Sequence, residues 1–113
     1  MAVRVFHGDD SDMFRTLVAE VLPDGDIEVC GHGATPDEVV VGVTREQPDV
    51  VLLDQFGGAQ LVDRVRAAAP AARIVVLSGH LRGDGDREIE ARADGYCVKT
   101  ADIDAMRAAV RGA

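Results

Sequence analysis

Five short apolar runs, rich in β-branched residues, alternate along this chain with segments of helical periodicity, and no other feature limits the possible folds as strongly. The apolar runs lie at residues 3–7, 27–30, 49–53, 73–77 and 96–98. Helical segments occupy about 12–22, the stretches around 36–43 and 61–68, and then about 87–93 and 102–112. Strands joined by helices must pair in parallel through right-handed crossovers. The sequence therefore predicts an α/β fold with a doubly wound, five-stranded parallel sheet in the common order 2-1-3-4-5, formed by one domain over residues 1–113.

The first two helical segments carry clear start signals. In the first, Asp12 is the expected N-cap, and an apolar face follows at helical spacing. That face consists of Phe14, Leu17, Val18 and Val21. In the second, Thr35 is the expected N-cap, Pro36 takes the first helical position and Glu38 closes a capping box. The interior of the second helix, VVVGV, has low helix propensity, but its valines still recur at helical spacing.

Composition and charge exclude several classes of function. The formal net charge is -8, so this chain by itself is expected to bind neither nucleic acid nor anionic membranes. The core must be aliphatic, because 47% of the residues are hydrophobic but only 4% are aromatic. No apolar run approaches the ~20 residues of a membrane span. The N-terminal MAVRVF has no features of a leader peptide, so a cytoplasmic location is expected. Cys30 and Cys97 lie in predicted strands at opposite sheet edges, as buried reduced thiols.

Polar side chains follow four of the predicted strands, at the edge of the sheet where ligands bind in open α/β folds. Asp9 and Asp10 follow the first strand, Asp54 the third, Ser78 the fourth and Lys99 the fifth. Strands one and three are neighbours in the predicted order, so the three carboxylates should lie together. Three carboxylates, a hydroxyl and an ammonium at one edge indicate a site for a divalent cation and a phosphoryl group.

The electrostatics of such a cluster favour a hard cation. Carboxylates ~4.5 Å apart repel by about 3–4 kcal/mol per pair at an effective dielectric constant near 20. Oxygen ligands with open coordination positions suit Mg²⁺, which often bridges to phosphate. Asp54 is then the best-placed nucleophile toward phosphorus, with the Ser78 hydroxyl and Lys99 pairing with phosphoryl oxygens. Gly79 would leave room for in-line approach.

The ordered set of segments resembles the receiver domain of two-component response regulators, closest to the NarL/FixJ-like subfamily. The segments that carry the resemblance are RVFHGDDSDMFR, IEVCGHG, QPDVVLLD, ARIVVLSGH and ARADGYCVK. The resemblance covers the whole chain and implies the flavodoxin- or CheY-like fold. It also implies that a sensor histidine kinase supplies the phosphoryl group. An attached or separate output domain, DNA-binding in the full-length regulator, would then be controlled. Only self-phosphorylation and self-dephosphorylation chemistry is expected of such a domain.

The resemblance also assigns roles to individual residues. Asp54 would be the phosphoacceptor, Asp10 a direct Mg²⁺ ligand and Asp9 a ligand largely through water. The backbone carbonyl of Phe56 would add a ligand, and Tyr96 would move inward as the switch residue Ser78 shifts. Lys99 would pair with the phosphate.

One segment departs from the family pattern. The chain reads DQFGGAQLVDRVR after the acceptor, and this loop is roughly four residues shorter than usual and has no proline. Gly57 and Gly58 are expected to make the loop flexible, which would weaken Mg²⁺ binding or slow phosphorylation. An interaction module that works independently of phosphorylation is therefore an alternative function. A haloacid-dehalogenase-like phosphatase is a remote one, suggested by Asp10-Ser11-Asp12 after a strand.

The histidines and the possible dimer complete the expectations. His7 replaces an apolar residue of the first strand and is expected to be a core histidine hydrogen-bonded to a neighbour. His32 is expected in a loop, and His80 is a candidate for the rim of the phosphate site. A homodimer could use the first and last helices, or the last strand and its helices. The end at Gly112-Ala113 fits a domain cut from a longer regulator.

Overall fold

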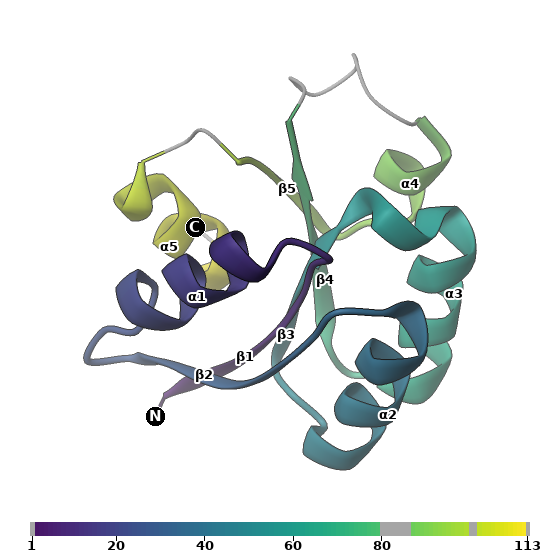
Figure 1. The fold of residues 1–113 in the computed structure, drawn as a ribbon, viewed down its shortest axis with the longest axis horizontal. Coiled ribbons are helices and arrows are strands. Elements are labelled where there is room, and N and C mark those ends of the chain that lie inside the picture. The colour runs from purple at the N-terminus through teal and green to yellow at the C-terminus, as the bar shows by residue number, and fades with distance from the viewer. Residues whose placement is uncertain (1, 80–86, 100–101, 113) are drawn as a thin grey trace.

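A computed structural model describes residues 2–79, 87–99 and 102–112 of the chain. Within these ranges, one parallel sheet has the strand order β2-β1-β3-β4-β5, which confirms the predicted topology. In Figure 1, α1 and α5 cover one face of the sheet, and α2, α3 and α4 cover the other. The strands are β1 (Val3–Gly8), β2 (Ile27–Gly33), β3 (Val50–Asp54), β4 (Arg73–Ser78) and β5 (Gly95–Val98). The helices are α1 (Asp12–Val21), α2 (Pro36–Glu46), the short 3-10 helix η1 (Gln55–Gly57), α3 (Gly58–Ala68), α4 (Arg87–Arg92) and α5 (Ile103–Arg111).

Strand register brings the polar strand ends together. Gly8 of β1 pairs with Leu53 of β3, so the residues that follow both strands emerge side by side. Asp54 pairs with Leu77 of β4, one residue before Ser78. The backbone N–H of Lys99 donates to the carbonyl of Ser78 over 2.7 Å, which continues the β4–β5 ladder by one residue. Carboxyl ends of neighbouring parallel strands therefore converge at one edge, as predicted.

The core has one apolar layer on each face of the sheet. Alternate residues of β1 enter different layers, with Val5 facing α1 and α5 and Phe6 facing α2 and α3. Side chains of β3 are buried on both faces, as a central parallel strand requires. Gly42 of α2 lies directly against the Phe6 ring, so α2 packs closely on β1 at this point. The core is almost entirely aliphatic, as the composition predicts.

Helix starts follow the sequence signals with two corrections. The Glu38 carboxylate accepts from the N–H of Ala34, one residue before the N-cap Thr35, so the predicted capping box is displaced by one residue. Thr35 caps α2 through its hydroxyl, which accepts from the N–H of Glu38, and Asp102 caps α5 through its carboxylate, which accepts from the N–H of Ala105. The α1 N-cap, however, is Ser11, whose hydroxyl accepts from the N–H of Phe14. Asp12, the predicted cap, is the first helical residue instead, where its negative charge favours the helix N-terminus.

Three other expectations differ from the structure. The predicted apolar face of α1 is only partly covered, because Leu17 is 48% exposed and Val21 is 37% exposed. His32 lies on the exposed face of the edge strand β2 and not in a loop. The stretch after Asp54, expected to be a loop, forms η1 and passes directly into α3.

The two cysteines are free thiols in the outer strands β2 and β5. Burial raises the pKa of both thiols. Cys97 is buried as predicted, but Cys30 is only half-buried. In the described part of the chain, no helix combines the length and the apolar character that crossing a bilayer demands.

Candidate functional site

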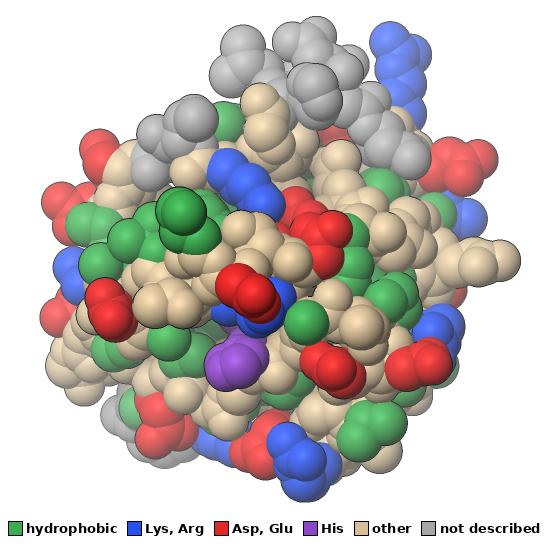
Figure 2. All heavy atoms as spheres, in the orientation of Figure 1, with side chains coloured by type: hydrophobic (Ala, Val, Ile, Leu, Met, Phe, Trp, Pro, Cys, Tyr) green, Lys and Arg blue, Asp and Glu red, His purple; other side chains and the backbone are tan. Residues whose placement is uncertain are grey.

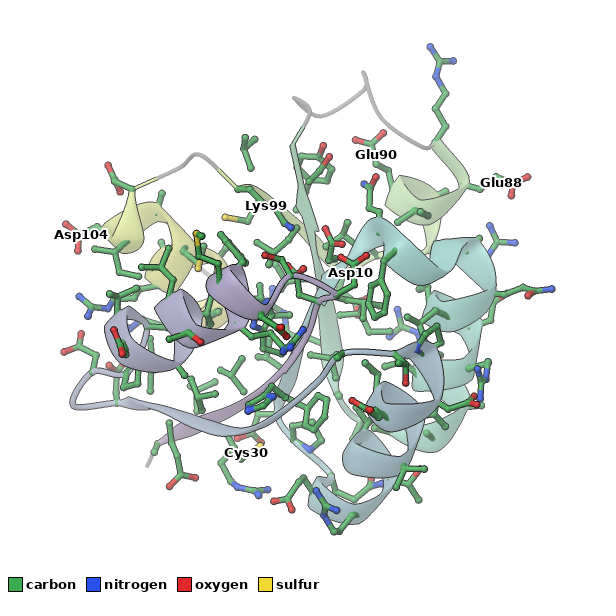
Figure 3. The ribbon with its side chains drawn as sticks, viewed as in Figure 1. Asp10, Cys30, Glu88, Glu90, Lys99 and Asp104 are labelled. Atoms are coloured by element: carbon green, nitrogen blue, oxygen red, sulfur yellow. The ribbon has the colours of Figure 1, made fainter. Side chains whose placement is uncertain are left out.

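Three carboxylates meet at the carboxyl edge of the sheet. Oxygen atoms of Asp9, Asp10 and Asp54 lie within 4.8 Å of one another. Asp9 is fully buried, Asp54 is partly buried and Asp10 is exposed, so the cluster runs from the core to the surface. Figure 2 shows acidic side chains near the middle of the molecular face that is turned toward the viewer, and Figure 3 shows Asp10 just after the end of β1. The structure thus brings together the three acids that the sequence analysis grouped.

Lys99 links two of these acids. Its Nζ lies 2.9 Å from Oδ2 of Asp9 and 3.0 Å from Oδ1 of Asp54. Its side chain is 25% exposed and points from the end of β5 toward the acids (Figure 3). Burial alone would lower the pKa of Lys99, but its contacts with Asp9 and Asp54 outweigh burial and raise that pKa. The ammonium therefore stays charged and offsets part of the carboxylate repulsion.

Asp9 is held rigidly on several sides. Its Oδ1 accepts from the backbone N–H of Ser11 over 2.9 Å, and its own N–H donates to the carbonyl of Gly33 over 3.0 Å. Burial would raise the pKa of Asp9, but polar contacts with His7, Lys99 and the Ser11 N–H outweigh burial and lower it to about 2. Asp9 is consequently ionised at neutral pH although it has no access to solvent.

The predicted phosphate-binding residues lie beside the acids. Ser78 ends β4 and is buried, one residue past the register partner of Asp54. Gly79 is exposed, and a Cβ added there would meet no atom within 4 Å, so packing within the protein does not require a glycine. The role predicted for Gly79, which is to leave room for a phosphoryl group beside Ser78, stays a prediction.

The remaining predicted residues have different outcomes. Phe56 lies in η1, two residues past Asp54, and its ring packs against the core layer under α2 and α3. Tyr96 lies in β5 beside Val76 and packs half-buried against the same layer. The switch role of Tyr96 and the ligand role of the Phe56 carbonyl stay predictions. His80 lies outside the described residues.

Two residues that the sequence analysis did not assign to the site support it from α1. Arg15 donates from Nη1 to the backbone carbonyl of Asp9 and forms an ion pair with Asp12. The Phe14 ring centre lies 4.6 Å from Lys99 Nζ, a cation–π distance. An aromatic and a basic residue in the first turns of a helix are too common for the sequence alone to mark them as site residues.

The Phe14 ring also borders a shallow groove between α1 and α5. The groove has a volume of about 150 Å³. It is lined by Phe14, Leu17, Val18, Val21, Lys99, Ile103 and Met106. Met13, 83% exposed, lies on the same helix. Figure 2 shows hydrophobic side chains gathered over α1 and α5. Lys99 therefore belongs both to the acid cluster and to this groove.

The donor set fits a hard divalent cation. Three carboxylates carry three negative charges, and Lys99 supplies one positive charge, which leaves a local excess of two. All three candidate ligands are oxygens, which Mg²⁺ prefers. The exposed Asp10 leaves a path for the ion and its waters to enter. Charge and ligand chemistry thus both match a magnesium ion.

Comparison with known proteins agrees with this geometry. Residues 5–111 match the family model described as the response regulator receiver domain. The chain therefore belongs to that family, the receiver domains of two-component response regulators, which are signalling domains. The NarL/FixJ-type resemblance is also confirmed by a solved relative. The NarL receiver domain of Mycobacterium tuberculosis is 28% identical with a TM-score of 0.86, and the alignment covers 98% of this chain and 94% of that one.

Two curated relatives are longer proteins. The response regulator VraR of Staphylococcus aureus is 29% identical over an alignment of 122 positions, which covers 99% of this chain and 58% of VraR. A protein-glutamate methylesterase/protein-glutamine glutaminase of Haloarcula marismortui is 31% identical over 93 residues, which cover 79% of this chain and 25% of that protein. The chain thus spans a quarter to just over half of these relatives.

Proposed function

We propose that this receiver domain accepts a phosphoryl group on Asp54 with the help of Mg²⁺ and thereby switches an interaction surface. The observation that carries the proposal is the pair of short contacts from Lys99, 2.9 Å to Asp9 and 3.0 Å to Asp54, inside a cluster of three carboxylates. Asp9, Asp10, Asp54 and the carbonyl of Phe56 would hold the ion. When bound, Mg²⁺ would neutralise charge on the phosphoryl oxygens.

The chain's own residues account for the transfer. A carboxylate oxygen of Asp54 attacks phosphorus, a new O–P bond forms, and the bond from phosphorus to the donor's nitrogen or oxygen breaks with its electron pair leaving on the donor. Lys99, already 3.0 Å from Asp54, pairs with one phosphoryl oxygen, and the Ser78 hydroxyl donates to another. Gly79 keeps the approach to Asp54 open. Tyr96 follows the shift of Ser78.

The partners follow from the family. A sensor histidine kinase would be the phosphoryl donor, and a separate or attached output domain would respond, with DNA binding and control of transcription in the full-length regulator. Self-dephosphorylation would reset the domain, so no turnover of an external substrate is expected. The location would be cytoplasmic. The exposed apolar residues of α1 and the adjoining groove support a homodimer through α1 and α5.

The direct test is phosphorylation by a small donor. The domain is incubated with acetyl phosphate and Mg²⁺, and intact mass reports the gain of one phosphoryl group. We expect a gain in the unsubstituted domain and none in Asp54→Asn, and peptide mapping should place the group on Asp54. No gain, or a gain that persists in Asp54→Asn, would contradict the proposal. Omitting Mg²⁺ is the matched control and should abolish the gain.

The short η1 turn motivates the second candidate, a module that binds its partner regardless of phosphorylation. It stands where the family resemblance implies a longer loop, and it contains Phe56, whose carbonyl is the fourth expected ligand. Under this alternative, Mg²⁺ at millimolar concentration would leave the amide spectrum of the domain unchanged. Shifts at Asp9, Asp10 and Asp54 on Mg²⁺ titration would exclude it.

A further inference from the structure

His7 is a core histidine, as the sequence predicts, but the expected hydrogen bond to a neighbour is not formed within the part of the chain that the structure describes. It is 1% exposed, and among the described residues neither of its ring nitrogens reaches an acceptor or a donor. It lies in β1, between the edge strand β2 and the central strand β3, where its register partners are His32 in β2 and Leu52 in β3. An apolar residue would fill this position without an unpaired polar group, so a buried imidazole here needs a reason.

The nearest acceptor is the innermost carboxylate of the site. His7 Nε2 lies 3.6 Å from Oδ2 of Asp9, a few tenths of an ångström beyond a hydrogen bond. That oxygen is buried and has no hydrogen-bond donor in favourable geometry, although the Lys99 ammonium lies 2.9 Å away. Oδ2 thus has a counter-charge but no aligned donor. His7 Nε2 and Asp9 Oδ2 are therefore a potential donor and an acceptor that lie 3.6 Å apart.

The position of Lys99 explains why we expect His7 Nε2 and Asp9 Oδ2 to come within hydrogen-bond distance. Lys99 contacts Asp9 and Asp54 together, and a phosphoryl group on Asp54 would compete for the same ammonium. When Lys99 turns to the phosphoryl oxygens, Oδ2 of Asp9 loses its 2.9 Å contact with the ammonium and is left without a nearby N–H from Lys99. A buried carboxylate oxygen left in that state is costly, and the His7 ring is the side chain in position to donate to it. The Phe14 ring packs against the imidazole in an edge-to-face arrangement, with 5.7 Å between the ring centres and 63° between the ring planes.

We propose that His7 is a positioning residue, whose imidazole donates from Nε2 to Asp9 Oδ2 when Mg²⁺ and a phosphoryl group occupy the site. The inference rests on the proposed magnesium and phosphoryl function. The donor holds the Asp9 carboxylate in the orientation that the ion requires, as outer-shell partners of metal ligands commonly do. It also gives Oδ2 of Asp9 a hydrogen-bond donor when Lys99 turns to the phosphoryl oxygens.

The test compares two variants of similar size. His7→Leu keeps the volume and removes the donor, whereas His7→Gln keeps an N–H near the place of Nε2. Mg²⁺ affinity is measured by amide-shift titration, first with Mg²⁺ alone and then with beryllofluoride added as a phosphoryl analogue. We expect His7→Leu to weaken Mg²⁺ binding about tenfold and His7→Gln to recover most of the loss.

A spectroscopic readout separates donation from packing. In the unsubstituted domain, imidazole ¹⁵N spectra should show the proton on Nε2, and its resonance should move downfield on addition of Mg²⁺ and beryllofluoride. A proton on Nδ1, an unmoved Nε2 resonance, or equal Mg²⁺ affinity in His7→Leu and the unsubstituted domain would overturn the proposal for His7 alone. Absence of any Mg²⁺ response in the unsubstituted domain would instead overturn the magnesium site itself, and the His7 proposal with it.

Discussion

The Lys99 ammonium lies 4.6 Å from the centre of the Phe14 ring and also contacts the carboxylates of Asp9 and Asp54. One side chain therefore connects the acid cluster to the apolar groove between α1 and α5. Any event that draws Lys99 toward a phosphoryl group on Asp54 changes the contact with Phe14 as well. A change at the acid cluster therefore alters the packing of Phe14 on α1 through the Lys99 side chain.

Replacement of Lys99 tests how much of the local charge balance depends on it. Lys99→Met leaves three carboxylates within 4.8 Å without a cation, so the free energy of unfolding should fall by about 2 kcal/mol at neutral pH. Mg²⁺ should restore part of the loss, because it binds the folded state alone. Urea denaturation with and without Mg²⁺ measures both effects.

The matched control for Lys99→Met is Arg64→Met. Arg64 forms a 2.9 Å ion pair with Asp37, but both side chains are largely exposed. Exposed pairs contribute less than about 1 kcal/mol, and this one should not respond to Mg²⁺. Equal losses in the two variants would show that Lys99 is no more important than a surface ion pair.

Asp9 should make stability depend on pH in acid. Its pKa is lowered from 3.8 to about 2, so its stabilising contribution is complete above 3.8 and is lost as the pH falls through 2. That contribution is about 2 kcal/mol. The difference in unfolding free energy between the unsubstituted domain and Asp9→Asn should therefore shrink by this amount over that pH range.

Other carboxyls also have lowered pKa values, among them Asp24 and Asp26 beside Arg111. They are present in both proteins, so the comparison with Asp9→Asn cancels them. If the unfolding free energies of the two proteins fell by the same amount as the pH is lowered, the assignment of the acid-dependent contribution to Asp9 would be wrong.

The fold and the acid cluster were predictable from sequence because they follow from periodicity and strand ends. Asp54 and Lys99 each directly follow an apolar strand, and parallel pairing sends both to one edge. The contact of Phe14 with Lys99 and the approach of His7 to Asp9 were not predictable, since they depend on side-chain positions that strand periodicity does not determine. The Ser11 cap was missed because Ser11 and Asp12 are both good caps, and only the backbone angles decide between them.

A glycine-to-alanine change in α2 should destabilise the domain, contrary to the usual effect in a helix. Alanine at an interior helical position normally adds about 0.5–1 kcal/mol over glycine. At Gly42, however, the new Cβ would collide with the Phe6 ring, which is buried and cannot move aside. The net loss should be about 1–3 kcal/mol.

A double-mutant cycle isolates the contact between Gly42 and Phe6. Phe6→Leu removes the ring atoms that an alanine at position 42 would strike, so Gly42→Ala should cost much less in that background. Urea denaturation of the four proteins provides the coupling energy. Additive losses would mean that the collision is not the cause.

The turn that follows Asp54 should depend on Gly58 in both stability and ion binding. Gly58 has φ 65° and ψ -167°, a backbone region that is nearly restricted to glycine. Gly58→Ala should therefore lower the free energy of unfolding by about 1–3 kcal/mol. It should also weaken Mg²⁺ binding, because the turn carries the Phe56 carbonyl that we propose as a ligand.

Gly25→Ala, where an added Cβ meets no atom within 4 Å, is the control and should change neither the free energy of unfolding nor the Mg²⁺ affinity. If Gly58→Ala lowers stability but leaves Mg²⁺ affinity intact, the geometry of this turn is structural and the Phe56 carbonyl does not bind the ion.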